Sequence, residues 1–581
     1  MPGKVSFHFD DGLISHYEQA FPIFQRAGAA GCLAVPALRI DRIGKERLLE
    51  MQDAGWEILS HSVNHIKMCE PLDAEAAEKE IGESKRMLEA QGFKVRQFIT
   101  PMSTCHPAHR ALLRKYYDAA FTVYTNSQTV PIEKLVIERP VNAYELHRAS
   151  LSAKTLDELR AYVDYVSETD SWIVFYEHGI GIGTNVTAEK LEALIGYCLE
   201  KGVRIMTSSA ALDEERCRTK ILRDGWDGTY CYVHARMGAD GNRRLITTQL
   251  LNTEGSDVFY PLCASFSRDG GKTWSEIRPQ ASFDQAVTNG IRTNTCDVTP
   301  YYHKKTGKFI VTGHQASYSL TGKQPLSTPD SLRSLPYAVF DEAAETFGEQ
   351  CFLSLPGEKY RDFGSGCSQI HELPDGDLLI PISFRRDTED GKPFSDAAVI
   401  RCAFDGRKLT LKEIGKDIRV NDEVRGIGEC SLAYQDGKYY LTVRGDTHGY
   451  VSVSEDGLNY TDPKIWCWED GEIVPSYNTQ SHWMQLGGKL WLVYTRKCGT
   501  NDHVFRHRAP LFVAEVNTDT VTLKRDSEYV AVPERGARLG NFGVCHVDDG
   551  HSVIIVSEWM QPKGCEAYGS CNAIWYTDVY K

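Results

Sequence analysis

The stretch KVSFHFDDG, at Lys4–Gly12, begins with a short run of apolar and β-branched residues and ends in two carboxylates and a glycine. Val5–Phe9 predicts a strand, and Asp-Asp-Gly predicts a turn directly after it. The runs SWIVFY at Ser171–Tyr176 and VRIMT at Val203–Thr207 predict further buried strands. The first part of the chain is therefore built on strands that each end close to polar residues.

Amphipathic stretches separate these strands. LDAEAAEKEIGESKRMLEAQ at Leu72–Gln91 and TAEKLEALIGYCLEK at Thr187–Lys201 predict helices, with Gly92 and Gly202 at their ends and Thr187 as an N-cap. Alternating strands and helices predict an α/β domain with a parallel sheet or barrel over residues 1–215.

The pattern changes near residues 213–220, where helical periodicity gives way to short strands joined by Gly- and Asp-containing turns. A strand–turn–strand unit occurs six times, at 230–250, 296–314, 367–384, 429–444, 480–496 and 541–558. The last five start 71, 62, 51 and 61 residues apart. A repeat near 60 residues with a central hairpin is typical of a β-propeller. We expect an all-β propeller of six blades over residues 222–581.

Composition excludes several classes of protein. Of 581 residues, 42% are hydrophobic and 25% charged, which is typical of globular chains. Lys and Arg number 65 against 79 Asp and Glu, and this charge of −14 argues against nucleic acid as a partner. A run of roughly 18 apolar residues, the minimum for a membrane span, is absent. The sequence therefore predicts neither a nucleic acid nor a membrane as a partner.

Cysteine use and the start of the chain bear on its location. The 17 cysteines are odd in number and form no CxxC pair, which favours reduced, buried thiols over a disulfide framework. The chain enters a strand within its first ten residues, without room for a signal peptide. We therefore expect a cytoplasmic protein. Nothing in the sequence specifies an oligomeric state.

Three polar segments lie at predicted strand ends: Asp10 and Asp11, then His61 and His65 within HSVNH, then His178. One carboxylate and two imidazoles form a three-ligand metal site that leaves positions open for water and substrate. A second carboxylate beside the ligand can take a proton from water, and a histidine opposite can protonate a leaving amine. Each segment alone is more often a turn or a surface histidine pair. Their combination favours a metal site.

These motifs, FDDG, HSVNH and the late histidine, resemble those of the polysaccharide deacetylases with NodB homology, a family of distorted (β/α) barrels. The resemblance covers about residues 4–212. It implies that Asp10 is the base, that Asp11, His61 and His65 hold the metal, and that His178 is the general acid. One divalent cation is implied; Zn²⁺ suits these ligands best, and Co²⁺, Ni²⁺ or Fe²⁺ also fit.

The chain departs from the family at two points. The Arg-x-Pro-Tyr-Gly motif of the family is only echoed by TPMS at Thr100–Ser103. The Met102 backbone N–H can still polarise a carbonyl. The arginine that steadies the base is missing from this segment, and Arg139 is a candidate substitute. The aspartate that orients the late histidine has no counterpart.

The second half contains SRDGGKTW at Ser267–Trp274, which fits the Asp-box, and a degenerate copy at Ser454–Tyr460. Asp-boxes are structural turns in which Asp and Ser side chains bind the backbone of a hairpin. The chain over 222–581 therefore resembles sialidase-like propellers, in which these boxes lie away from the active face.

A sialidase needs arginines that bind a carboxylate, a tyrosine nucleophile with a glutamate partner, and an aspartic acid. Asp297 is a candidate acid, Glu429 a candidate partner, and Tyr477 or Tyr494 a candidate nucleophile. Residue spacing does not select among the arginines, which are Arg292, Arg361, Arg425, Arg444, Arg496, Arg508 and Arg538. His503 and His507 add donors that suit an anionic sugar, or cap a loop.

The sequence thus predicts a multidomain hydrolase that acts on an acetylated sugar or oligosaccharide. The first domain is expected to remove an N-acetyl group, less readily an O-acetyl group, and the propeller to bind or cleave the glycan. Two alternatives stay open. In one, the propeller is an exo-glycosidase beside a vestigial deacetylase domain. In the other, the protein binds glycans without catalysis.

Overall fold

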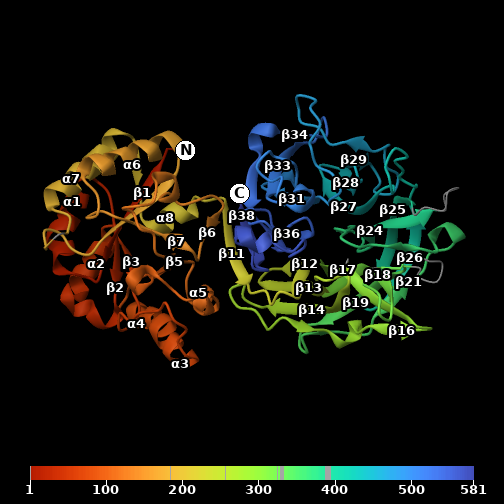
Figure 1. Cartoon of the computed structure of the whole chain (residues 1–581), viewed down its shortest axis with the longest axis horizontal. Helices are drawn as coiled ribbons and strands as arrows, with labels where there is room; N and C mark the ends of the chain where they lie inside the picture. Colours follow the sequence, from red (N-terminus) through yellow and green to blue (C-terminus); the bar gives the residue numbers. More distant parts are fainter. Residues whose placement is uncertain (1, 184, 256, 324, 327–332, 387–393) are drawn as a thin grey trace. The chain divides into compact units, whose positions relative to one another are not determined.

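The computed structural model describes residues 2–183, 185–255, 257–323, 325–326, 333–386 and 394–581. The chain forms two compact units, residues 1–220 and 221–581 (Figure 1). Within the described residues, no helix combines the length and apolar character that a membrane crossing requires.

The first unit is built on one parallel sheet of nine strands, in the order β7-β5-β4-β3-β2-β1-β9-β8 with β10 beside β1. Six of them have apolar, fully buried stretches at their centres. The strands are β1 (Lys4–Asp10), β2 (Cys32–Val35), β3 (Glu57–Ser60), β4 (Gln97–Ile99), β5 (Ala119–Val123), β7 (Leu146–His147), β8 (Ala149–Ser150), β9 (Trp172–Glu177) and β10 (Arg204–Ile205). Burial on both faces explains why these runs are apolar without alternation.

Arg148 lies between the two edge strands of this sheet. The edge strands β7 and β8 are neighbours in sequence, separated only by Arg148, yet β7 pairs with β5 and β8 pairs with β9. One short segment therefore joins the two edges and makes the sheet a near-closed barrel, which confirms the predicted distorted (β/α) barrel.

Helices connect the strands and pack around the sheet. They are α1 (Phe21–Arg26), α2 (Lys45–Asp53), α3 (Ala74–Ala77), α4 (Ser84–Ala90), α5 (Arg110–Tyr116), α6 (Leu156–Thr169), α7 (Ala188–Glu200) and α8 (Ser208–Asp213). A π-helical segment, Glu78–Glu83, joins α3 to α4. Thr187 caps α7 by accepting a hydrogen bond from the Lys190 N–H at 3.2 Å. Apolar residues three or four apart, such as Leu191, Leu194 and Cys198, bury one face of α7.

The second unit consists of six sheets of antiparallel strands, which confirms the predicted six-bladed propeller. The first three sheets contain β12 (Tyr230–Asp240), β13 (Arg243–Asn252), β14 (Phe259–Ser267), β15 (Arg278–Pro279); β16 (Ala286–Thr288), β17 (Ile291–His303), β18 (Lys308–Ser319), β19 (Leu335–Asp341), β20 (Thr346–Phe347), β21 (Cys351–Leu353); and β22 (Phe363–Gly364), β23 (His371–Glu372), β24 (Leu378–Arg386), β25 (Phe394–Phe404), β26 (Leu409–Ile414).

The remaining three sheets follow in chain order. They contain β27 (Gly428–Gln435), β28 (Lys438–Arg444), β29 (Gly449–Ser454), β30 (Lys464–Ile465); β31 (His482–Leu486), β32 (Lys489–Tyr494), β33 (Leu511–Asn517), β34 (Thr522–Leu523), β35 (Tyr529–Val532); and β36 (Phe542–Asp548), β37 (His551–Ser557), β38 (Ile574–Tyr580). β11 (Cys217–Arg223), in which the boundary between the units falls, lies beside β38 in the sixth sheet.

Apolar clusters between successive sheets hold the propeller together. One cluster joins Leu245 and Phe266 of the first sheet to Phe309 and Phe340 of the second. Two turns outside the sheets are fixed by side chains. In the first, the Asp269 carboxylate accepts hydrogen bonds from the backbone N–H groups of Lys272 and Thr273 at 3.0 and 2.9 Å. Asp456 does the same in the second turn.

Candidate active site and the arginine cluster of the propeller

Asp11, His61 and His65 meet at the carboxyl ends of β1 and β3. His65 Nε2 lies 3.1 Å from Asp11 Oδ1, and His61 Nε2 lies 4.0 Å from the same oxygen. One ligating atom from each residue lies within 4.8 Å of the others. Parallel strands end at the same edge of a sheet, which is why motifs 50 residues apart in sequence converge here.

The hydrogen bond made by His61 prepares its ring for a cation. Its Nδ1 lies 2.8 Å from the Ile99 carbonyl oxygen, and since a carbonyl only accepts, Nδ1 carries the proton. Nε2, which lies 4.0 Å from Asp11 Oδ1, is left with its lone pair. Burial lowers the pKa of His61 to about 4, so the ring is neutral at pH 7. An imidazole fixed in this way by its second nitrogen is the usual form of a metal ligand.

A buried carboxylate fixes the loop between the two histidines. Glu80 accepts hydrogen bonds from the backbone N–H groups of Val63 and Asn64 at 3.1 and 2.9 Å. The loop needs this support because Ser62 and His65 both have positive φ, 62° and 61°.

Asp10 lies beside this group and pairs with Arg148. The guanidinium donates to both carboxylate oxygens, at 2.7 and 3.0 Å, and both side chains are buried. Burial alone would raise the pKa of Asp10, but the opposite charge of Arg148 outweighs it and holds the pKa well below its usual range. Asp10 is therefore a carboxylate in a fixed orientation at neutral pH.

Arg139, the residue favoured from sequence for this position, lies elsewhere. Its guanidinium donates to Glu215 at 2.8 and 3.1 Å, in a pair that also includes Lys4. This is a correction to the prediction. Arg148 was missed because it belongs to no short motif, and only the closure of the barrel places it beside Asp10.

His178 follows β9 and is exposed, while its backbone is tightly held. The buried His16 accepts at Nδ1 from the Leu13 N–H at 3.1 Å, so its Nε2 carries the proton and donates to the His178 carbonyl oxygen at 2.8 Å. Glu177 accepts from the His178 N–H at 2.9 Å. His178 is also close enough to Asp10 to help lower the pKa of that carboxyl.

Met102 follows β4, the strand whose Ile99 carbonyl binds His61. Its side chain is 61% exposed and its backbone has φ 59°, in the left-handed region. In this conformation the backbone N–H points in a direction different from that in a regular turn or strand. Because the residue is exposed, a substrate can reach it.

In the propeller, four arginines gather where the innermost strands begin. Arg444 and Arg506 both donate to the Asn478 side-chain oxygen, and Arg508 donates to the Asn478 backbone carbonyl, 3.1 Å from Nε. Arg538 stacks on Trp559 with its guanidinium 3.8 Å from the ring centroid. We call these four residues the arginine cluster.

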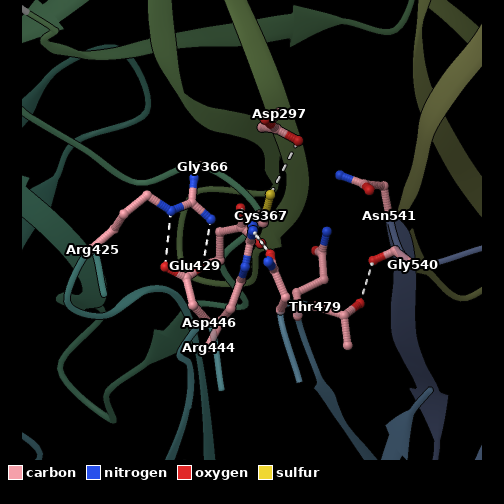
Figure 2. A network of polar contacts seen from close by, with 12 residues as sticks. Asp297, Gly366, Cys367, Arg425, Glu429, Arg444, Asp446, Thr479, Gly540 and Asn541 are labelled. Atoms are coloured by element: carbon pink, nitrogen blue, oxygen red, sulfur yellow. Dashed lines mark hydrogen bonds and ion pairs between the residues drawn. The ribbon is translucent and has the colours of Figure 1, made fainter. Parts of the chain in front are cut away.

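The arginine cluster has an excess of positive charge. Burial lowers the pKa of Arg508, and the guanidinium groups of Arg444 and Arg538 lower it further. The pKa of Arg538 falls to about 10, mainly because of burial. The nearby carboxylates are Glu429, paired with Arg444, and Asp257. Asp446 is paired with Arg425, so this neutral pair is left out of the count (Figure 2). The four guanidinium groups and the two carboxylates together carry a net charge of +2.

The other sequence candidates are dispersed. Arg496 and Tyr494 both bind Glu528, and Tyr494 is fully buried inside the fifth sheet. Arg292 stacks on Tyr318, and Arg361 is exposed after a short 3₁₀ turn. The Tyr477 hydroxyl lies 2.7 Å from His507 Nδ1 and so contacts a histidine, not a glutamate. His503 contacts Glu534 at 2.9 Å.

Asp297 does not have the properties of a general acid. His234 Nδ1 and Cys367 Sγ each lie 3.1 Å from its Oδ1, and Arg236 lies 3.6 Å from the same oxygen. Burial would raise the pKa of Asp297, but the neighbouring histidines and Arg236 hold it well below its usual range. These contacts favour the ionised carboxylate and so disfavour the role of general acid that the sequence predicts for Asp297.

The propeller contains a cavity of about 1510 Å³, and no member of the arginine cluster lines it. Tyr301, Tyr434, Tyr439, His371 and Lys304 line it. Gln369 bonds to the backbone of Trp483 and Val544 at its inner end.

Comparison with known proteins agrees with this division. Residues 2–120 match the family model of the polysaccharide deacetylases, so the first unit carries a polysaccharide deacetylase domain. No curated protein sequence matches the chain.

Several solved structures show a distant likeness to the chain. A protein of unknown function from Dyadobacter fermentans is 12% identical with a TM-score of 0.46, over 62% of this chain and 99% of that one. A Trypanosoma rangeli sialidase is 14% identical with a TM-score of 0.43, over 60% and 55%. A CE4 family pseudoenzyme from Bacillus anthracis is 15% identical with a TM-score of 0.28, over 37% and 66%. Likeness at this level says nothing of activity.

Proposed function

Because the first unit carries a polysaccharide deacetylase domain, we propose that the protein is a metal-dependent carbohydrate deacetylase that hydrolyses an N-acetyl group on a sugar or oligosaccharide. The observation that carries the proposal is the convergence of Asp11, His61 and His65 on one point, beside a carboxylate held by Arg148. An O-acetyl ester is the less favoured substrate, because an ester needs less assistance than this arrangement offers.

The donor set fits a divalent cation. Asp11, His61 and His65 would hold it and leave positions open for water and substrate, as in catalytic zinc sites. Such a cation, when bound, lowers the pKa of its water toward about 7. Zn²⁺ suits two imidazoles and a carboxylate best, while Co²⁺, Ni²⁺ and Fe²⁺ accept the same ligands.

The chain's own groups supply the proton transfers. Asp10, ionised and oriented by Arg148, accepts a proton from the attacking water. The Met102 N–H stabilises charge on the acetyl oxygen. His178, on the far side, donates a proton to the departing amine, which leaves as the free amino sugar together with acetate. His16 positions His178 through its carbonyl oxygen.

Acetate release tests this proposal. We expect release from an N-acetylated chito-oligosaccharide to exceed that from an O-acetylated xylo-oligosaccharide, and to disappear in Asp11→Ala. Asp53→Ala, at the end of α2 away from the ligands, is the matched control and should keep full activity. Full acetate release by Asp11→Ala would overturn the metal-dependent mechanism.

A second proposal concerns the propeller. The arginine cluster, with its charge of +2, supports recognition of an anionic group such as a sugar carboxylate, since guanidinium groups bind carboxylates through paired hydrogen bonds. Cleavage is disfavoured, because Asp297 stays ionised and Tyr494 is buried. We expect sialyllactose to bind and lactose not to bind. Equal affinity for both sugars, or hydrolysis of sialyllactose, would contradict this proposal.

A further inference from the structure

The innermost strands of the propeller share an unusual backbone feature. Five sheets each place one residue other than glycine in the left-handed region, either within the innermost strand or shortly before it: His234, Asp297, Cys367, Glu429 and Asn478, with φ between 47° and 66°. In β12, β17 and β27 a shift of pairing register accompanies it. Such bulges turn a side chain away from its regular direction, and this conformation costs energy in residues other than glycine.

Three residues of this region form a compact group of metal-binding atoms. His314 Nε2 lies 3.3 Å from Cys296 Sγ and 3.7 Å from Asp297 Oδ2. The ligating atoms of Cys296, Asp297 and His314 all lie within 4.8 Å of one another. Tetrahedral zinc with bonds of 2.0–2.3 Å separates neighbouring sulfur, nitrogen and oxygen ligands by about 3.4–3.6 Å. The observed distances are close to this spacing.

The surrounding residues are arranged to hold these three in place. A Cβ on Gly366 would lie 1.9 Å from His314 Nδ1, and one on Gly364 would lie 2.4 Å from His314 Cβ. Both glycines are therefore needed for the ring to occupy its position. Cys367, next to Gly366, donates to Asp297 Oδ1 at 3.1 Å (Figure 2).

Unsatisfied polar atoms also indicate a ligand. His234 is fully buried and faces Asp297, yet neither of its ring nitrogens has a hydrogen-bond partner among the described residues. Arg236 lies 3.6 Å from Asp297 and is 1% exposed. A thiolate and a carboxylate around a divalent cation would have no net charge, and an ordered water could occupy the open fourth position.

A nucleophilic role for the thiol is excluded by burial. Cys296 has no exposed surface, so the carbon of a substrate cannot reach its sulfur. A small cation can reach the group from the side of His314, whose side chain is 22% exposed.

We propose that Cys296, Asp297 and His314 bind a thiophilic divalent cation such as Zn²⁺ in the propeller, separate from the cation of the deacetylase unit. The chain then binds two cations, and the two sites differ in chemistry, because only the propeller site contains a sulfur ligand. The proposal is independent of the activity of either unit.

Cobalt titration of the full, reduced chain tests this site. Co²⁺ bound to a thiolate gives a sulfur-to-metal charge-transfer band in the near ultraviolet, which the Asp-His-His group cannot produce. We expect two equivalents of Co²⁺ to bind and one to produce the band. Cys296→Ser should bind one equivalent without the band, and Asp11→Ala one equivalent with the band. Cys430→Ser, which removes another buried thiol beside a bulge residue, should behave as the wild type.

A second variant protects the test against misfolding of Cys296→Ser. Gly366→Ala leaves every ligand in the sequence but displaces the His314 ring, so the band should be lost while the circular dichroism spectrum is kept. A wild-type chain that binds a single equivalent of Co²⁺ without a charge-transfer band would overturn the proposal. So would a band that persists in Cys296→Ser.

Discussion

The deacetylase site and the propeller clusters are assembled in opposite ways. The first takes most of its residues from short motifs, in which Asp10 and Asp11 are adjacent and His61 and His65 are four apart. The arginine cluster of the propeller instead combines Arg444, Arg506, Arg508 and Arg538, which come from the fourth, fifth and sixth blades. A site of the first kind is visible in a sequence, whereas a site of the second kind appears only when the blades close.

The two units also differ in how their charged side chains are paired. In the first unit, the buried Asp10 and Lys4 are paired with Arg148 and Glu215 respectively. In the propeller the arginine cluster has more positive than negative groups. We therefore expect the first unit to depend on the correct orientation of a few groups, and the propeller to depend on its total charge.

Replacement of the base should have the largest effect. Asp10→Asn keeps the shape of the side chain and the three metal ligands but removes the proton acceptor. We expect kcat for acetate release to fall by about 10²–10⁴-fold while one equivalent of metal stays bound to the deacetylase unit. Steady-state kinetics and metal analysis measure both quantities. A variant with unchanged kcat would show that Asp10 is not the base.

Replacement of the arginine that pairs with Asp10 tests whether Arg148 or Arg139 fills this role. Arg148→Gln leaves a buried carboxylate unpaired, which should cost about 3–5 kcal/mol in unfolding free energy. Without Arg148, burial raises the pKa of Asp10, so the acidic limb of the kcat/KM profile should move to higher pH. Arg139→Gln, the matched control, should leave this limb in place. A shift with Arg139→Gln alone would reverse the assignment.

Loss of one exposed member of the arginine cluster should have a smaller effect. Arg506→Gln removes a charged donor, worth about 1.5 kcal/mol, so affinity for sialyllactose should fall by about 10-fold. Arg525→Gln, in an exposed pair with Asp470 and Glu472, is the matched control. Calorimetric titration of the full chain measures both. Equal losses in the two variants would indicate an unspecific effect of net charge.

The pH dependence of stability gives a further test that concerns the first unit alone. Burial lowers the pKa of His16 to about 4, below its value near 6.5 in the unfolded chain. The folded state therefore favours the neutral ring, and His16 costs no stability above pH 6.5 but up to about 3 kcal/mol as the pH falls from 6.5 to 4.

His16→Gln checks this effect, because an amide can accept from Leu13 and donate to His178 without titrating. We expect urea unfolding of the first unit to be less pH-dependent in the variant between pH 6.5 and 4. Identical pH profiles would contradict the assignment.

The sequence predicted much of the fold because its signals are local. Periodicity located β1, β9, α7 and the six blade repeats, and glycines and an N-cap marked helix ends. The repeat starts at 296, 367, 429, 480 and 541 also fall within two residues of positions where the innermost strands depart from regular geometry or begin. The sequence therefore located the innermost strands of the propeller without indicating which side chains come into contact there.

The remainder depends on contacts between distant segments. Arg148 is placed by barrel closure, and an Arg followed by Ala carries no signal of it. Asp297 is a candidate acid by residue type, and only the positions of His234, Arg236 and Cys367 show that its surroundings disfavour that role. Side-chain environment, which sets a pKa, is a tertiary property that residue spacing does not encode.

Anomalous diffraction from crystals loaded with Zn²⁺, recorded on both sides of the zinc absorption edge, locates the bound cation. We expect a peak about 2.0–2.2 Å from Asp11 Oδ1 and from the Nε2 atoms of His61 and His65. A map that shows zinc elsewhere in the chain and none between these three side chains would contradict this expectation.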